Sequence, residues 1–401
     1  MDDRKIFLGS NLKYISKTNS KKFQNIKKLQ HSKIFVSKKF LYIIIFVLLL
    51  LIIILLFVIY YQKKNLYPIY KDPEDFIYYN TSEMDEAKNL FIYREDHTEI
   101  KDKNKIRICY CIDSNLVYPT LVSMTSALEN NDKEKNVIVF YLFLPHNFDK
   151  KRIEIFESLK KKYLVKIHYF LIPPRFNRQR KWTWGTATIY FKLYIPFVLP
   201  HLKRILYLDG DTLVYKDLLE LFNLDFHDNY ALGYPFHNVQ MMDKWGVKLV
   251  NYINGGVILF NLEKIIRDNK DAELFDFTLK HNGRLYFLEQ DGLNLVFYNH
   301  TGLLPLKYGI YLFGNITTYR NVVKKFLRVE LNETELMEAI DNPSIVHFAG
   351  CFPKIWEKKK KYKTVFGDQS VCFKAHEDFY VYAKKTEYGE HIYKQYVKDR
   401  L

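Results

Sequence analysis

Apolar and polar positions divide the chain into a membrane-like helix, a polar segment and a large folded region. Residues 40–61 (FLYIIIFVLLLLIIILLFVIYY) carry no charge and are long enough to cross a hydrocarbon core of roughly 30 Å as a helix. A cleaved signal peptide is the competing interpretation, but this run is too long, begins far from the N-terminus and lacks a small-residue cleavage site. Residues 62–103 are polar and mixed in charge, which is typical of a stem.

Strand-like and helix-like patterns alternate from residue 105 onward. Short runs rich in β-branched and aromatic residues predict strands, whereas apolar residues that recur every three or four positions predict helices. The predicted strands are 106–112, 137–144, 165–171 and 205–208, and the predicted helices are 118–130, 150–162 and 188–199. This alternation is typical of a largely parallel sheet covered by helices. We therefore expect an α/β domain over residues 104–360, followed by one or two helices in residues 361–401.

Charge orients the predicted membrane helix. Residues 1–39 hold eleven Lys and Arg but two Asp, which is +9 of the total net charge of +16. Because basic residues favour the cytoplasmic side, we expect a single-pass type II protein of the Golgi or secretory pathway, with a cytoplasmic tail and a lumenal C-terminal part. Sequons at Asn80, Asn299, Asn315 and Asn332 fit a lumenal address. The sequence has no zinc-finger, helix-turn-helix or RNA-binding signature, so nucleic acid is not an expected partner.

The cysteines and a basic run leave alternatives open. Cys109 and Cys111 alternate with apolar residues in a predicted strand, so we expect them to pack as small apolar side chains rather than to bind a metal. Cys351 and Cys372 could form a disulfide in an oxidising compartment, a pairing that the sequence does not assign. The run 357–363 is strongly basic, which fits either a solvated surface or one that grips an anionic acceptor or a membrane.

Candidate chemistry is concentrated in residues 204–214 (RILYLDGDTLV). The apolar part of this stretch predicts a strand buried on both faces, and it stops at Asp209-Gly210-Asp211. Side chains alternate along an extended chain, so the two carboxylates are expected to aim at one point, where they suit Mg²⁺ or Mn²⁺ bound to phosphate. Gly210 is expected to let a ligand approach the backbone. The alternative is an ordinary Asp-Gly turn after a core strand.

Further motifs occur in a defined order along the chain. They are a strand that ends in Asp113-Ser114-Asn115, then YLDGD, NGGVILFNL (254–262), EQDGLN (289–294) and HFAGCFPKIW (347–356). In this order they resemble glycosyltransferase family 8, which contains retaining, metal-dependent nucleotide-sugar transferases. The resemblance covers residues 105–356. It implies the GT-A fold, a Rossmann-like α/β domain with a mixed sheet, and transfer of a hexose or pentose from a UDP-sugar to an acceptor hydroxyl with retention of the α-configuration.

The resemblance also assigns a metal site. Asp209, Asp211 and His347 match the family's ligands for Mn²⁺ or Mg²⁺, and a neutral imidazole can complete such a set. Without the other motifs, His347 would be taken as an ordinary strand-end histidine. Gly350 and Lys354 match positions beside the leaving diphosphate, where glycine allows close approach and lysine supplies a positive charge.

The remaining matches concern the nucleoside and the sugar. By resemblance, Asp113 and Asn115 hold uracil and ribose, Lys192 contacts the diphosphate and sugar, Asn254, Gly255 and Glu289 contact the sugar, and Gln290 lies below the anomeric carbon, oriented by Asp291. Lys192 stands where the family usually has Arg, and Glu289 stands where it has Asp.

These roles lead to a mechanism and to two rival hypotheses. Gln290 is too weak a nucleophile for double displacement, so we expect front-side attack in which the leaving phosphate oxygen takes the acceptor proton. The expected acceptor is a glycan, glycoprotein or glycolipid. One rival is a catalytically inactive lumenal sugar- or nucleotide-binding protein, or scaffold, on the same fold. The other is a membrane-tethered phosphohydrolase, which would need a second metal site that the sequence does not offer.

Overall fold

The computed structural model describes residues 42–43, 45–53, 55, 91–173, 175–176, 186–236, 245–247, 249, 251–311, 333–350, 354 and 370–396. The chain divides into two compact units, Met1–Asp75 and Phe76–Leu401. In the first unit the described residues, between positions 42 and 55, are helical. Among the described residues, no helix is both long and apolar enough to cross a bilayer. The predicted membrane span 40–61 lies partly, and the basic tail 1–39 wholly, outside the described residues, and both stay predictions.

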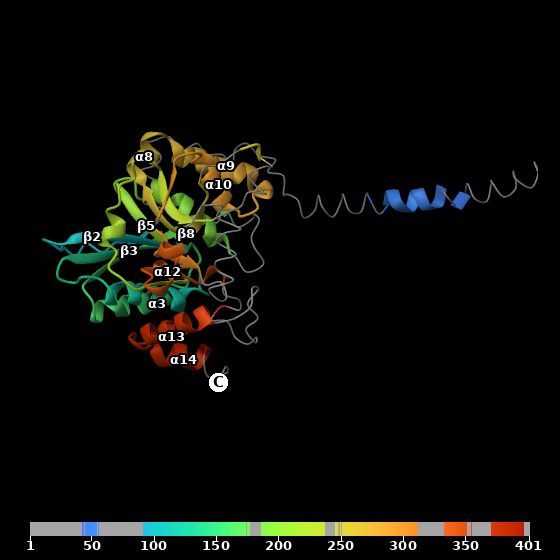
Figure 1. Ribbon diagram of the computed structural model, residues 1–401. Coiled ribbons are helices and arrows are strands. Elements are labelled where there is room, and N and C mark those ends of the chain that lie inside the picture. Colours follow the sequence, from blue (N-terminus) through green and yellow to red (C-terminus); the bar gives the residue numbers. More distant parts are fainter. Residues whose placement is uncertain are drawn as a thin grey trace, which may run out of the picture. The chain divides into compact units, whose positions relative to one another are not determined.

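A mixed sheet forms the centre of the second unit (Figure 1). Its strands within the described residues are, in spatial order, β1 (Ile92–Arg94), β4 (Val165–Ile172), β3 (Asn136–Pro145), β2 (Asn104–Cys111), β5 (Arg204–Leu208), β8 (Ile253–Asn261), β7 (Ala231–Pro235) and β9 (Thr301–Leu303). The four predicted strands, β2 to β5, are parallel neighbours, which confirms that part of the prediction. Beyond β5 the sheet changes direction, because β8 is antiparallel to both β5 and β7.

The edge strand β1 changes the predicted domain boundary. It pairs with β4 in the antiparallel sense, so residues 92–94 belong to the sheet. The predicted stem, residues 62–103, therefore contains at its C-terminal end an element of the folded unit. The rest of that stem, up to residue 90, lies outside the described residues.

Helices cover both faces of the sheet, and alternate side chains of β2 show why. Ile106, Ile108 and Tyr110 pack into one core with α3 (Val117–Glu129) and α4 (Ile153–Glu157). Cys109 and Cys111 point to the opposite core, which contains residues of α8 (Leu262–Arg267), α9 (Lys270–His281) and α10 (Glu289–Val296). Both cysteines are buried and form no disulfide, as predicted for small apolar side chains. The proposed pairing of Cys351 with Cys372 lies outside the described residues and side chains.

Two predicted helices are shorter than the apolar pattern suggests. Residues 150–162 form the 3₁₀ turns η2 (Lys150–Arg152) and η3 (Ser158–Lys161) on either side of α4. Residues 188–199 form the 3₁₀ segment η5 (Ala187–Tyr194) followed by the short α5 (Ile195–Val198). The break before α5 has a local cause, since Pro196 lacks an amide hydrogen and is tolerated in the first turn of an α-helix but not in its interior.

A second, smaller sheet brings distant parts of the chain together. Within the described residues it consists of β10 (Tyr308–Tyr311), β11 (Ile345–His347) and β6 (Thr212–Val214). β11 is antiparallel to β6, and His347 is the direct partner of Thr212. The C-terminal motif is thereby placed beside the residue that follows Asp211.

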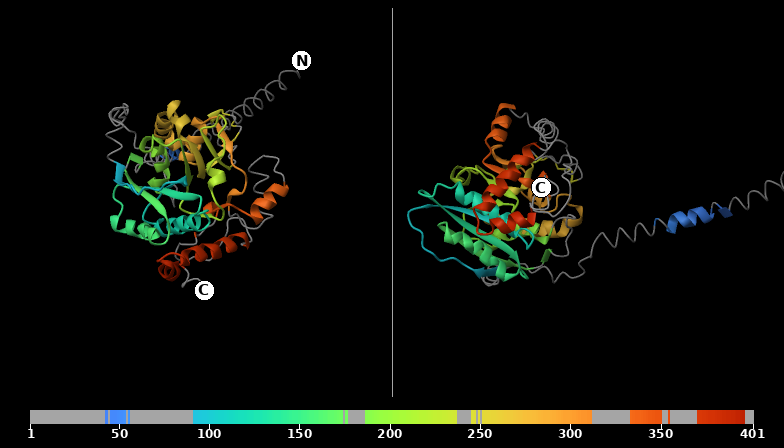
Figure 2. Two further views of the ribbon diagram at one scale, coloured as in Figure 1. Left: turned by 90° about the vertical axis from the view of Figure 1, so that its left-hand side faces the viewer. Right: turned by 90° about the horizontal axis from the view of Figure 1, so that it is seen from below.

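The C-terminal helices pack against this smaller sheet and α3 (Figure 2). These are α13 (Ser370–Lys384) and α14 (Gly389–Tyr396), and α12 (Glu333–Asp341) joins the same core. Asn130 donates a hydrogen bond to the hydroxyl of Tyr382 at 2.7 Å, and Lys385 lies 2.6 Å from a carboxylate oxygen of Glu129. The two helices are therefore an integral part of the second unit.

Candidate active site

A cavity of about 1240 Å³ lies at the carboxyl ends of β2 and β5. It is lined by the loop after β2, the first turn of α3, η5, the turn after β5, the start of β8, α10, the end of β11 and α14. Ligands of open α/β sheets bind beyond the carboxyl ends of strands, which is where this cavity opens. All the predicted site residues line it except Asp291 and Gly350.

Asp209 and Asp211 lie in a tight turn between β5 and β6, not in an extended strand. The hydroxyl of Thr212 donates to the carbonyl oxygen of Asp209 at 2.9 Å and closes this turn. The hydroxyl of Tyr207, on β5, donates to Asp209 Oδ1 at 2.7 Å. Both interpretations of the motif therefore hold at once: the chain turns at Asp-Gly-Asp, and the turn presents two carboxylates to the cavity.

Gly210 has a packing role that the sequence did not predict. A Cβ atom at this position would lie 2.3 Å from Oγ1 of Thr120, on α3. The glycine is therefore needed because α3 packs directly against the turn. Gly210 also lines the cavity, so the predicted approach of a ligand to its backbone stays a prediction.

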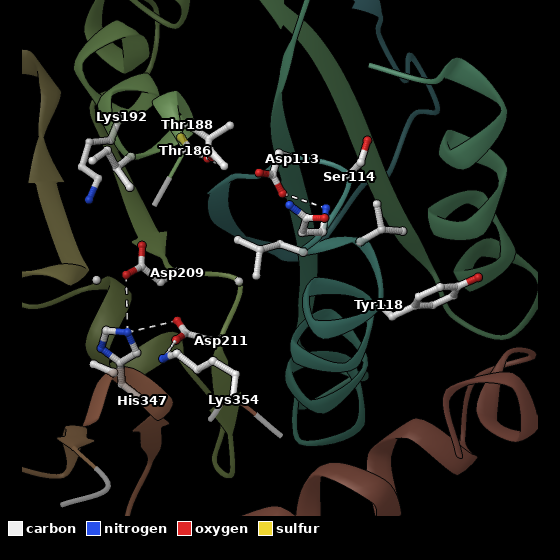
Figure 3. Close-up of a pocket in the computed structure, with 18 of the residues that line it drawn as sticks. Asp113, Ser114, Tyr118, Thr186, Thr188, Lys192, Asp209, Asp211, His347 and Lys354 are labelled. Atoms are coloured by element: carbon white, nitrogen blue, oxygen red, sulfur yellow. Dashed lines mark hydrogen bonds and ion pairs between the residues drawn. The ribbon is translucent and has the colours of Figure 1, made fainter. Parts of the chain in front are cut away.

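His347 meets the two aspartates at the end of β11 (Figure 3). Its Nε2 lies 3.1 Å from Asp211 Oδ1 and 3.4 Å from Asp209 Oδ2. One ligand atom from each of the three side chains falls within 4.8 Å of the other two. The position of His347 follows from its strand pairing with Thr212 and is reinforced by the amide of Phe348, which donates to the carbonyl oxygen of Asp211 at 2.9 Å.

The electrostatic balance of this group keeps both carboxylates ionised. Burial alone would lower the pKa of His347, but the carboxylates of Asp211 and Asp209 outweigh burial and raise it to about 9. For Asp209, Lys192 and His347 outweigh burial and lower the carboxyl pKa. Lys354 and His347 do the same for the pKa of Asp211. A divalent cation bound here would replace the proton on the imidazole as the source of positive charge.

The space around these side chains fits a divalent cation. A Cβ atom on Gly256 would lie 2.2 Å from Cε1 of His347 and 2.6 Å from Oδ2 of Asp209, so any larger residue would displace both. Gly256 faces them because its carbonyl oxygen accepts a hydrogen bond from the amide of Asp209 at 2.8 Å across the β5–β8 pair. Two carboxylates and one imidazole form a donor set that suits Mn²⁺ or Mg²⁺.

Lys354 contacts the same group through Asp211. Its Nζ donates to Asp211 Oδ2 at 2.7 Å and to the carbonyl oxygen of Phe348 at 2.5 Å. Gly350 ends the 3₁₀ turn η8 (Phe348–Gly350), which begins directly after β11. The structure thus places the predicted lysine beside the metal-binding group.

Lys192 and Glu289 form a buried ion pair at another wall of the cavity. Lys192 Nζ donates to Glu289 Oε1 at 2.9 Å and to the carbonyl oxygen of Gly255 at 2.7 Å. The same ammonium group lies 4.5 Å from the ring centroid of Tyr207. Burial would lower the pKa of Lys192, but the carboxylates of Glu289 and Asp209 raise it. The ammonium group of Lys192 is therefore held charged near Asp209, paired with Glu289, whose own pKa is raised by burial.

Gln290 is held in one orientation by its neighbours. Its Oε1 accepts hydrogen bonds from the amide of Gly255 at 2.8 Å and from Asn254 Nδ2 at 3.0 Å. Its Nε2 donates to the hydroxyl of Tyr252 at 3.0 Å, and this hydroxyl donates to Asp291 Oδ1 at 2.5 Å. Asp291 thus lies behind the cavity wall and acts on Gln290 through Tyr252, a residue that the sequence motifs did not single out.

Asp113 lies across the cavity from Lys192 (Figure 3), and Asn115 lines the same cavity. Asp113 Oδ1 accepts a hydrogen bond from the amide of Asn115 at 2.8 Å, which shapes the loop after β2. Arg152, which also lines the cavity, donates from Nη1 to the carbonyl oxygen of Ser114 at 2.8 Å and fixes the same loop. The predicted nucleoside, metal and sugar residues therefore face one shared cavity.

The model of glycosyl transferase family 8 matches residues 107–360, more than half of the chain and the segment that holds every predicted site residue. The chain belongs to glycosyltransferase family 8. Enzymes of family 8 transfer sugars from nucleotide donors and use a divalent metal, for which Asp209, Asp211 and His347 form a suitable group.

Relatives of this family 8 chain include bacterial lipopolysaccharide enzymes. Lipopolysaccharide 1,2-glucosyltransferase of Escherichia coli is 29% identical over 236 residues, covering 56% of this chain and 68% of the relative. Lipopolysaccharide 1,3-galactosyltransferase of Salmonella typhimurium is 27% identical over 234 residues, covering 53% and 66%. The solved galactosyltransferase LgtC, in complex with donor and acceptor sugar analogs, has a TM-score of 0.57 at 18% identity and covers 70% of this chain and 96% of its own. This likeness shows a GT-A-like mixed α/β fold.

Three residue groups of this family 8 site were not predicted from the sequence. Tyr207 carried a usable signal, because residues two apart on a strand share a face and Asp209 follows it at that spacing. Tyr252 precedes the NGG motif and has no local signature. His391 and Lys394 line the cavity from α14, which lies beyond the segment that matches the family.

Proposed function

We propose that this protein transfers a hexose or pentose from a UDP-sugar to an acceptor hydroxyl with retention of the α-configuration and with Mn²⁺ as its cofactor. The observation that carries this proposal is the meeting of Asp209, Asp211 and His347 within 4.8 Å at the rim of a cavity large enough for a nucleotide sugar. Pockets for ligands of that kind measure about 300–1,000 Å³.

Each wall of the cavity has a proposed task. Asp209, Asp211 and His347 would hold the cation, which supplies positive charge to the departing diphosphate. Lys354, with Gly350 nearby in the chain, adds a second positive charge on the same side. Asp113 and Asn115 bind the nucleoside.

We place the sugar at the wall that faces Asp113 across the cavity. Lys192 and Glu289 lie there as a buried pair, with Asn254 and Gly255 beside them. We assign the sugar hydroxyls to this wall. The choice of donor sugar then depends on which hydroxyls can form hydrogen bonds with Glu289 and Lys192 in addition to the bond between these two side chains.

Retention is assigned to front-side attack. The carbonyl oxygen of Gln290 already accepts two hydrogen bonds, from Gly255 and Asn254, and an amide oxygen is a weak nucleophile. This supports a route in which the leaving phosphate oxygen takes the acceptor proton while Gln290 positions the sugar. Asp291 acts as a positioning residue through Tyr252.

We further propose a type II membrane topology in the Golgi or secretory pathway. The proposal rests on the uncharged apolar run 40–61 and the basic residues 1–39 before it, followed by a stem from residue 62, the catalytic domain and the C-terminal helices. The acceptor is then a glycan, glycoprotein or glycolipid on the lumenal side, in keeping with the lipopolysaccharide acceptors named for its relatives.

The decisive experiment supplies Mn²⁺ and a panel of UDP-sugars to the full chain in detergent and detects sugar transfer and UDP release by mass spectrometry. We expect one or a few UDP-sugars to be turned over, and the double substitution Asp209→Asn with Asp211→Asn to abolish turnover. Turnover that survives this double substitution would refute the metal site. UDP binding without turnover of any sugar would instead favour the inactive binding protein.

A further inference from the structure

One end of the cavity is lined by a helix that is not part of the matched family segment. His391 and Lys394 of α14 line the cavity together with Tyr118 and Ile155. The family match ends at residue 360, so this wall is supplied by the C-terminal extension of the chain. Figure 3 shows Tyr118 on the same side of the cavity as Asp113 and Ser114, away from the metal-binding group.

Contacts with the catalytic domain hold α14 in place. Ile392, next to His391, is fully buried in the core that α14 shares with the smaller sheet. Glu387, just before the helix, lies 2.8 Å from Lys161. The ring of Tyr118 lies 4.9 Å from the ring of His391 and 6.0 Å from that of Tyr388. The wall is therefore built into the folded unit, and His391 stands at a defined position beside Tyr118.

The chemistry of this end suits a flat ring with acceptor groups on its edge. Leu116, Ile155 and the ring of Tyr118 supply apolar surface. Arg152, His391 and Lys394 supply hydrogen-bond donors, and Asp113 is the one carboxylate among the described residues that line this end. Arg152 is fixed beside the loop 113–115 by its bond to Ser114. A diphosphate would instead lie near the metal-binding group, at the end of the cavity away from Tyr118 and His391.

We infer that α14 completes the nucleotide site, and that Tyr118 and His391 contact the base of the donor, a pyrimidine with two carbonyl oxygens. The inference rests on the proposed function, in which Asp113 and Asn115 hold the nucleoside. Aromatic side chains bind bases through their faces, and donors such as Arg152 and His391 match the carbonyl edge of uracil better than the amino group of cytosine.

The test is calorimetric titration of the full chain in detergent with UDP and, separately, with pyrophosphate, both in the presence of Mn²⁺. We expect His391→Ala to weaken UDP binding by between about 5-fold and 150-fold, the usual range for one base contact with an aromatic side chain. The affinity for pyrophosphate should stay unchanged, since His391 lies away from the metal-binding group. Lys394→Ala, a second variant of the same wall, should weaken UDP binding to a smaller extent.

The matched control is Tyr393→Ala, which removes an exposed aromatic ring from the same helix but from a position that does not line the cavity. It should bind UDP like the wild type. Unchanged UDP binding in His391→Ala would overturn the inference, as would an equal loss of UDP and pyrophosphate binding in that variant or, in a parallel titration with CDP, a wild-type preference for CDP over UDP. A wild-type protein that binds neither UDP nor pyrophosphate would overturn the proposed function itself.

Discussion

Gly256→Ala tests the metal site without changing a single ligand. The added Cβ would lie 2.2 Å from Cε1 of His347, 2.9 Å from its Nδ1 and 2.6 Å from Oδ2 of Asp209. Real Cβ contacts are essentially never closer than 3.0 Å, so the imidazole and the carboxylate must both move. Changes that disturb only the groups supporting a metal ligand cost about 10–100-fold in affinity. Because two ligands move here, we expect a loss of more than about 100-fold for Mn²⁺.

The assay is calorimetric Mn²⁺ titration of wild type and variant, with thermal unfolding to show that both are folded. Gly302→Ala is the matched control, because its Cβ would overlap Cδ2 of Leu232 at 2.4 Å, in strand β9 and away from the cavity lining. Overpacking costs about 1–3 kcal/mol of stability, so both variants should unfold at lower temperature. The reasoning would be refuted if Gly256→Ala stayed folded and bound Mn²⁺ as tightly as the wild type.

Three further predictions follow from the site and its surroundings. Tyr252→Phe should lower kcat about 10–100-fold with little change in KM, since a hydrogen bond to a charged group is worth about 1.5–3 kcal/mol. The control is Tyr230→Phe, which loses a partly buried bond to Asp268 at 3.1 Å, away from the cavity lining. Equal kcat for the two variants would contradict the prediction. Lys192→Met should destabilise the fold by about 3–5 kcal/mol in urea unfolding, because Glu289 is left buried and unpaired. Adding Glu289→Met should restore part of the lost stability. If the destabilisations of the two single variants simply added up in the double variant, the proposed ion pair would be contradicted. Burial opposes ionisation of Glu129, but Lys385, Tyr163 and Lys162 lower its pKa from 4.5 to about 2, so its stabilisation is complete above pH 4.5 and is lost as the pH falls toward 2. Glu129→Gln should therefore cost about 1–2 kcal/mol at pH 7 and almost nothing near pH 2, and a cost that does not change with pH would contradict this.

Much of the parallel half of the sheet was predictable because burial on both faces leaves a local mark on the sequence. Runs such as Val137–Leu144 and Ile205–Leu208 are apolar without interruption, which is how strands covered on both sides are composed. The helix of residues 118–130 was predicted to within one residue at each end, since its apolar residues recur with the helical period. The 3₁₀ segment at 187–194 was not predicted, because its apolar residues fit an α-helix equally well.

Site residues were predicted by motif, and the geometry that unites them was not. His347 lies more than a hundred positions after Asp211 and reaches it because β11 pairs with β6 in a particular register. Gly210 packs against Thr120 of α3, a contact that the motif did not predict. Local pattern cannot report either fact, since both depend on which segments become neighbours.

The sequence by itself determined the class of fold, the family and the identity of the residues that could bind a cation and a nucleotide sugar. Only the tertiary structure decided that β8 runs antiparallel, that Tyr252 links Asp291 to Gln290, and that α14 lines the cavity. The physical reason is the distance along the chain over which the interactions act. Hydrophobic periodicity and short motifs record what each residue needs from its own segment, while strand register and helix docking arise from contacts between segments that the chain order leaves far apart.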